Sequence, residues 1–323
     1  MLDSLRQLRS WAPSPTVIRR AFLGALVMNT VIVVTGGAVR LTASGLGCPT
    51  VPKCTETSMV VTREMGVHGV IEFGNRMLTF VLTAAVLAAL VTAWRAARRD
   101  LRRLAGVLVL GILVQAVLGA VTVLTGLNPV TVMAHFLVSM GLLAVAAYAY
   151  DVASGPRVRA TTVVRPEIRV GGYLLAALVA ATLVAGTVVT GTGPHSGDEN
   201  ASHRLPFDLA DVTQLHADLV VLFVGLTVGL IIALRATDAP REVLRRAMAL
   251  LGIALAQGLV GGAQYLTDLP VALVGLHVLG AALVWIATLR LLLSMTQRVQ
   301  EPVATGERAH DDLVVAPAAA ARP

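Results

Sequence analysis

The amino-acid sequence predicts an all-α polytopic membrane protein with eight transmembrane helices, arranged as two four-helix bundles that repeat each other in parallel. Of 323 residues, 56% are hydrophobic and 14% are charged, whereas about a quarter of the residues of a typical soluble domain are charged. Apolar runs of the roughly 20 residues that a bilayer-spanning helix needs occur eight times. The last of these runs repeat a pattern found earlier in the chain.

The eight runs cover residues 21–39, 69–93, 105–126, 131–150, 171–191, 212–234, 246–265 and 270–294. The first run is too long for a signal-peptide core and no convincing cleavage site follows it, so we expect it to be retained. The runs divide the chain into a cytoplasmic segment (1–20), a first unit (21–152), a cytoplasmic linker (153–170), a second unit (171–294) and a tail (295–323). The tail is polar and then rich in Ala and Pro, which is typical of disorder.

The arginines indicate the topology. They are concentrated before the first run and in every second connection, which places those segments in the cytoplasm together with both termini. The chain is thus expected to be a multi-pass protein of the cell (plasma) membrane. This bias accounts for the net charge of +7, so the expected partner is the lipid bilayer and no nucleic-acid binding is predicted.

The internal repeat is clearest in four residues. Gln115 precedes His135 by the same number of residues as Gln257 precedes His277, and a glycine follows each Gln by four. One offset relates both pairs and both glycines, which indicates a duplicated unit. Each unit has an even number of helices, so the units are expected to be parallel and related by an axis along the membrane normal.

Three histidines lie near the outer end of apolar runs: His135, His216 and His277. A lone membrane histidine is usually a hydrogen-bonded packing residue. However, two facing helices of a bundle can supply axial imidazoles to one haem iron. We predict that His216 and His277 ligate one haem. Zinc would need further ligands, and the second unit offers only Asp218, which faces another side of its helix.

The first unit departs from this pattern. His135 corresponds to His277, but the residue that corresponds to His216 is Asn75. Asparagine is not a useful haem ligand, so this unit would hold a haem with one strong ligand or with a substitute. His68 is the possible substitute, because it lies seven residues before Asn75 on the same helix face. Unequal sites suggest one fixed haem and one exchanged haem.

Four features together resemble the haem A synthase family over residues 15–295: "GGAVRLTASGLGCP", "IEFGNR", "VTGTGPHSGD" and the three histidines. The resemblance implies an enzyme that oxidises a ring methyl of haem O to the formyl group of haem A for cytochrome oxidase. It implies a haem B cofactor at His216 and His277, and a substrate haem at Glu72 and His135. The expected partners are haem O synthase and cytochrome oxidase assembly factors. The usual Glu-x-x-His-Arg motif is Glu72-x-x-Asn75-Arg76 here.

Other polar residues have two interpretations each. Arg40 and Arg76 would bind haem propionates, or Arg40 would extend to the membrane surface. Gln115 and Gln257 would contact haem or bridge helices. Glu72 would form an ion pair with Arg76, or it would move a proton or position the methyl group during hydroxylation; the two are compatible.

The two cysteines, Cys48 and Cys54, lie in the first outer loop. That compartment is oxidising, so we expect a disulfide, either a local staple or a redox-active pair. Two rival functions remain at this level. One is a haem-based electron carrier of the quinol-linked cytochrome b type, with two permanent haems. The other is a two-repeat transporter, whose purified form would be colourless.

Overall fold

The structure is a computed structural model that describes residues 12–155, 160–195, 197–198 and 203–298. In this part of the chain eight helices are long and apolar enough to cross a membrane, as predicted. They are α2 (Pro15–Leu41), α3 (Gly66–Arg95), α4 (Arg99–Leu124), α5 (Pro129–Ser154), α6 (Pro166–Thr192), α7 (Leu209–Ala236), α8 (Arg241–Leu266) and α9 (Val271–Ser294). A short 3-10 helix, η1 (Arg63–Met65), precedes α3.

Capping residues extend several helices beyond the apolar runs. The Ser14 side chain accepts a hydrogen bond from the Val17 amide, and Asn128 and Asp208 cap α5 and α7 in the same way. A side-chain oxygen at this position satisfies amides that have no partner inside the helix. Proline follows Ser14 and Asn128, where it has no amide to leave unsatisfied. The helix starts therefore depend on caps, which hydropathy does not detect.

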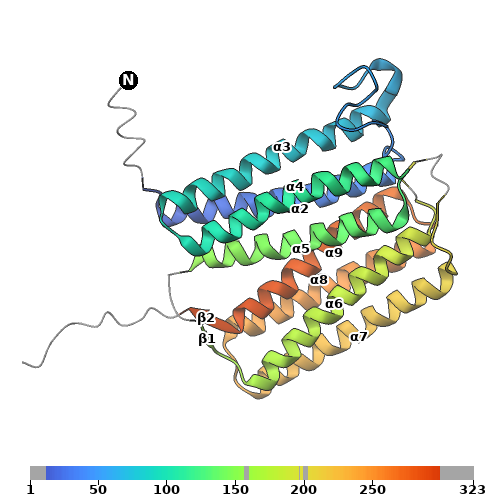
Figure 1. Ribbon diagram of the computed structural model, residues 1–323. Coiled ribbons are helices and arrows are strands. Elements are labelled where there is room, and N and C mark those ends of the chain that lie inside the picture. The colour runs from blue at the N-terminus through green and yellow to red at the C-terminus, as the bar shows by residue number, and fades with distance from the viewer. Residues whose placement is uncertain (1–11, 156–159, 196, 199–202, 299–323) are drawn as a thin grey trace, which may run out of the picture.

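The helices pack as two rings of four. In the first bundle α2 and α4 each contact α3 and α5, so α3 and α5 face each other across the diagonal. The second bundle has the same order, with α7 and α9 on one diagonal. Figure 1 shows the first four helices (blue to green) beside the last four (yellow-green to orange-red). Helix α9 contacts both α2 and α5, and Trp285 Nε1 donates to the Met140 carbonyl at 3.0 Å.

The packed apolar core fills only one end of each bundle. Counting from the end where α2 begins, the two buried clusters reach outward to one residue on each helix: Val33, Leu82, Ile112 and Met140 in the first, and Val179, Phe223, Ala254 and Val284 in the second. His216 lies seven residues, about two turns, beyond Phe223, and His277 lies seven residues beyond Val284 and five beyond Ala282, the residue that α9 adds to the first cluster. The two histidines thus lie beyond the buried residues of both clusters.

A two-stranded ribbon connects the two halves at the end of the bundles where α2 begins, which is called the inner end here after the predicted topology. Strand β1 (Ala160–Thr162) pairs antiparallel with β2 (Thr296–Arg298), and the Val163 amide donates to the Met295 carbonyl at 3.0 Å. The prediction of a tail from residue 295 is therefore corrected at its start, because backbone pairing with the linker orders residues 296–298. Residues 299–323 lie outside the described part. The predicted symmetry axis and the cytoplasmic side of the termini stay predictions.

Candidate functional site

His216 of α7 and His277 of α9 face each other across the diagonal of the second bundle. Their ring centroids are 6.4 Å apart and the ring planes meet at 66°. A metal–imidazole nitrogen bond is about 2 Å long, so two imidazoles on opposite sides of one iron have centroids about 6 Å apart. The observed separation is close to the separation expected for two imidazoles that bind one metal ion from opposite sides.

The His216 ring is held in one orientation. Its Nδ1 donates to the Thr182 carbonyl of α6 at 3.1 Å. This bond fixes the proton on Nδ1 and leaves the Nε2 lone pair as a ligand. The ring lies against Gly186, where an added Cβ would be 3.1 Å from its Cε1 atom. Glycine at this position therefore makes the space for the ring.

The His277 ring of α9 packs in a similar way against α8. An added Cβ at Gly261 would lie 3.1 Å from its Cε1 atom, so a glycine again receives the ring. Gln257 Nε2 donates to the His277 backbone carbonyl at 2.8 Å. Gly280 leaves room for the Gln257 carboxamide, which an added Cβ would overlap. His277 Nδ1 is buried and has no hydrogen-bond partner among the described residues.

The first bundle repeats this arrangement around His135. Gln115 Nε2 donates to the His135 carbonyl at 3.1 Å and also to the Ser139 hydroxyl. An added Cβ at Gly119 would be 3.4 Å from the His135 ring. Gln115 and Gln257 therefore bridge helices, one of their two predicted interpretations. Their contact with haem stays a prediction.

The other side of the first bundle has no second histidine at this depth. Asn75 and His216 each lie 20 residues before the last residue of their helix, Arg95 and Ala236. The Thr35 hydroxyl of α2 lies 2.7 Å from Asn75 Oδ1, to which it donates. Asn75 is thus held to α2 and sits on α3, the helix diagonal to that of His135.

His68 contacts the first outer loop. Its Nδ1 is 3.1 Å from the Ser44 hydroxyl, and Ser44 is fully buried and bonded to Thr42. The His68 ring is exposed at the outer end of α3. Its predicted role as a substitute iron ligand stays a prediction.

Glu72 is buried in an ion pair that also holds the first outer loop. Its two oxygens accept from Arg76 Nη2 and from the Cys48 amide, each at 2.5 Å. Arg76 also donates to the carbonyls of Cys48 and Thr50 at 2.8 and 3.0 Å. The predicted pair is therefore present. Its hold on the loop was not foreseen, because the partners are backbone groups that no side-chain pattern identifies.

The predicted disulfide joins Cys48 and Cys54, and both residues are fully buried. It lies within the loop segment that Arg76 holds against α3. Cys54 Sγ lies 3.6 Å from the Met65 sulfur of η1.

Arg40 joins the two bundles at their outer ends. It donates from Nε to the His195 carbonyl at 2.7 Å and from Nη2 to the Thr190 carbonyl at 2.9 Å. Backbone acceptors in the second half thus bind the Arg40 guanidinium, and the alternative in which Arg40 extends to the membrane surface stays a prediction. The His195 ring in turn donates to the Leu269 carbonyl at 2.9 Å. The predicted propionate contacts of Arg40 and Arg76 stay predictions.

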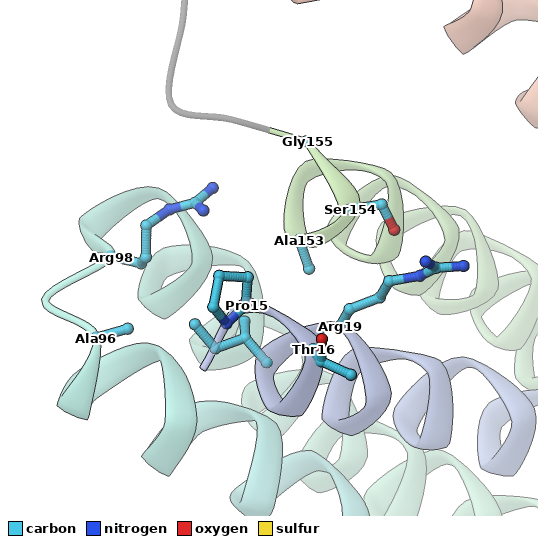
Figure 2. A pocket seen from close by; sticks show the side chains of 9 residues that line it. Pro15, Thr16, Arg19, Ala96, Arg98, Ala153, Ser154 and Gly155 are labelled. Carbon is cyan, nitrogen blue, oxygen red and sulfur yellow. The ribbon is translucent and has the colours of Figure 1, made fainter. Parts of the chain in front are cut away.

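A cavity of about 470 Å³ opens at the opposite end of the first bundle, and Figure 2 shows it. None of the predicted site residues lines it. Arg98 at its edge is engaged by Asp100 at 2.6 Å, and Arg19 by the Tyr150 hydroxyl. The lining residues are Pro15, Thr16, Ile18, Arg19, Ala96, Arg98, Ala153, Ser154 and Gly155. In the described part of the chain, no group of three or more His, Cys, Asp or Glu residues could hold a metal ion.

The fold and the site define a multi-pass α-helical membrane protein made of two four-helix bundles, each with a histidine site beyond its packed core. Residues 19–195, more than half of the chain, match the COX15-CtaA family, described as cytochrome oxidase assembly protein. The chain belongs to this family. The match covers the first bundle and α6, and it ends before His216 and His277.

Three curated relatives are named heme A synthase. The Bacillus pumilus protein is 37% identical over 114 residues, 34% of this chain and 36% of that protein. The Geobacillus kaustophilus protein is 32% identical over 114 residues, 35% of each chain. The Listeria welshimeri protein is 30% identical over 117 residues, 36% of this chain and 38% of that protein. The chain therefore matches just over a third of the length of these relatives.

Proposed function

We propose that this protein is a haem A synthase of the cell membrane, which oxidises a ring methyl of haem O to a formyl group through successive hydroxylations. The observation that carries the proposal is the histidine pair of the second bundle, whose ring centroids are 6.4 Å apart. Membership of the cytochrome oxidase assembly family and the names of the curated relatives support the same reaction.

The second bundle fits a resident haem B. His216 and His277 would be its axial ligands, and Gly186 and Gly261 leave the space that their rings occupy. The hydrogen bond from Nδ1 to the Thr182 carbonyl leaves the His216 Nε2 lone pair, which would bind the iron. When bound, haem B would supply one-electron redox chemistry for the methyl oxidation.

The first bundle would receive the substrate. His135 is set on Gly119 and Gln115 as His277 is set on Gly261 and Gln257, which suits the same kind of planar ligand. With Asn75 in place of a second histidine, this haem would be held less firmly than haem B. A substrate must leave after conversion, so the weaker site suits haem O and the stronger site suits the cofactor.

Glu72 would serve the hydroxylation as the group that moves a proton or positions the methyl. Its carboxylate is buried, and Arg76 and the Cys48 amide hold it in one place. A fixed, buried carboxylate loses little orientation freedom when a substrate arrives. We expect haem O synthase to deliver the substrate and cytochrome oxidase assembly factors to take up the product.

The deciding experiment identifies the haems. The protein is co-expressed with a haem O producer and purified, and its haems are extracted and weighed by mass spectrometry. Haem B together with haem O and haem A is the expected result. Haem B alone at two per chain would indicate an electron carrier, and a colourless protein would indicate a transporter; either would overturn the proposal.

Replacing Gly261 by alanine should weaken haem B binding roughly tenfold, as changes around a metal ligand commonly do. The new Cβ would press on the His277 ring from 3.1 Å and turn it away from the iron. Gly258→Ala is the matched control, because nothing lies within 4 Å of a Cβ there. Haem absorbance per protein, followed during dilution, gives the loss. Equal retention by both variants would contradict the role given to Gly261.

A further inference from the structure

The two bundles share a histidine with the same surroundings, but they differ in the residue on the helix diagonal to it. His135 and His277 share the same glutamine, glycine and backbone contacts, but their diagonal counterparts are Asn75 and His216. Building on the proposed function, we propose that the haem iron of the first bundle is held by His135 alone. Its opposite coordination position is open, is lined by the Asn75 carboxamide, and binds small neutral molecules such as carbon monoxide.

Depth supports Asn75 as the residue opposite His135. Asn75 and His216 stand at the same distance from the inner ends of α3 and α7, and each lies seven residues beyond the last cluster residue of its helix, Leu82 and Phe223. His135 and His277 each lie six residues after the first residue of α5 and α9. The diagonal that carries two imidazoles in the second bundle thus carries one imidazole and one amide in the first.

The contact with Thr35 fixes what Asn75 offers. The Thr35 hydroxyl is 2.7 Å from Asn75 Oδ1 and further, 3.1 and 3.3 Å, from the Val31 and Ile32 carbonyls of its own helix, so its single proton is assigned to the amide oxygen and ties it to α2. The Nδ2 group is then left as a hydrogen-bond donor. A carboxamide is a poor iron ligand but a good neighbour for a polar or polarisable molecule on the iron.

The other side chains near this end of α3 that could bind iron lie further out or are engaged. His68 lies seven residues before Asn75, about 10 Å further out along the helix at 1.5 Å per residue, and its exposed side chain contacts Ser44 of the loop through Nδ1. Both Glu72 oxygens accept hydrogen bonds, from Arg76 and from the Cys48 amide. Cys48 and Cys54 are bonded to each other. None of these groups stands at the depth of His135.

Carbon monoxide tests the inference, because it binds ferrous haem only at an open or weakly held position. Holoprotein with two haems per chain is reduced and titrated with carbon monoxide. We expect one of the two haems to bind it, since His216 and His277 occupy both faces of the other. The oxidised protein should likewise show one high-spin and one low-spin haem by electron paramagnetic resonance, a measurement that requires no variant.

Three variants test which residue lies at the coordination position opposite His135. Asn75→His should lower carbon monoxide affinity at least tenfold while both haems are retained, because it restores the second imidazole. Asn75→Leu should keep the binding but raise the stretching frequency of the bound carbon monoxide, because the amide donor is lost. His68→Ala should bind as the wild type does.

Two results would overturn the inference. One is a wild-type protein with two low-spin haems that bind no carbon monoxide, with binding gained in His68→Ala; this would make His68 the ligand. The other is an Asn75→His variant that binds carbon monoxide as the wild type does. A protein that never exceeds one haem per chain, even when haem is added in excess, would instead contradict the proposed function, and the inference with it.

Discussion

Replacing His277 by alanine should remove haem B from the second bundle, with at least a hundredfold loss of affinity. The iron would lose one of two axial imidazoles whose rings are 6.4 Å apart. The alanine would also leave an unfilled space beside Gly261, which already has no side chain. His216→Ala should have the same effect from the other face. Pyridine haemochrome spectra and mass identification of the extracted haem measure the loss.

His135→Ala is the matched control for this prediction. It removes the equivalent histidine from the first bundle, with the same glutamine and glycine neighbours, and it should keep haem B while it loses the substrate haem. Retention of tightly bound haem B in both His216→Ala and His277→Ala would show that the cofactor lies elsewhere.

Glu72→Ala should lower the conversion of haem O to haem A by about 10²-fold or more, the usual contribution of a positioned acid or base. Haem B should stay bound, because Glu72 lies on α3 of the first bundle and the proposed haem B ligands lie on α7 and α9. Haem O and haem A are separated by chromatography after a fixed time of co-expression. Haem B content is read from the same extract.

The loop contacts of Glu72 require a second comparison. Arg76→Ala also releases the segment 48–53 from α3, because Arg76 donates to three of its carbonyls. If Glu72 acts on the substrate, Glu72→Ala should lose much more activity than Arg76→Ala. Equal losses in the Glu72 and Arg76 variants would reduce Glu72 to a loop anchor.

Cys48→Ser should leave haem binding intact, and wild-type activity in that variant would make the disulfide a local staple.

Hydropathy and the spacing of polar residues along the chain were enough to predict the eight spans and the repeated Gln and His residues. The eight spans follow from apolar runs, because a bilayer-crossing helix needs about 20 such residues whatever its neighbours are. The matched Gln and His spacings indicated a repeat, and Gln115 and Gln257 make equivalent contacts in the structure. A glutamine inside an apolar helix must find a hydrogen-bond partner, and in each bundle it is the carbonyl of the histidine 20 residues later.

The sequence was less informative wherever backbone groups decide the outcome. Because Ser14, Asn128 and Asp208 cap their helices, these helices begin before the apolar runs begin. Pairing of β2 with β1 ordered the residues after α9. Each of these depends on local hydrogen bonds that average hydropathy does not record.

Residue identity thus determined the eight spans, the repeat, the disulfide and which side chains could serve a haem. Only the tertiary structure decided which of them meet. It placed His216 and His277 on diagonal helices, engaged Arg40 with carbonyls of the second half and bound Glu72 to the first loop. The reason is physical: hydropathy and spacing follow from neighbours along the chain, whereas these contacts join groups 24 to 155 residues apart, and they form only when the bundles pack.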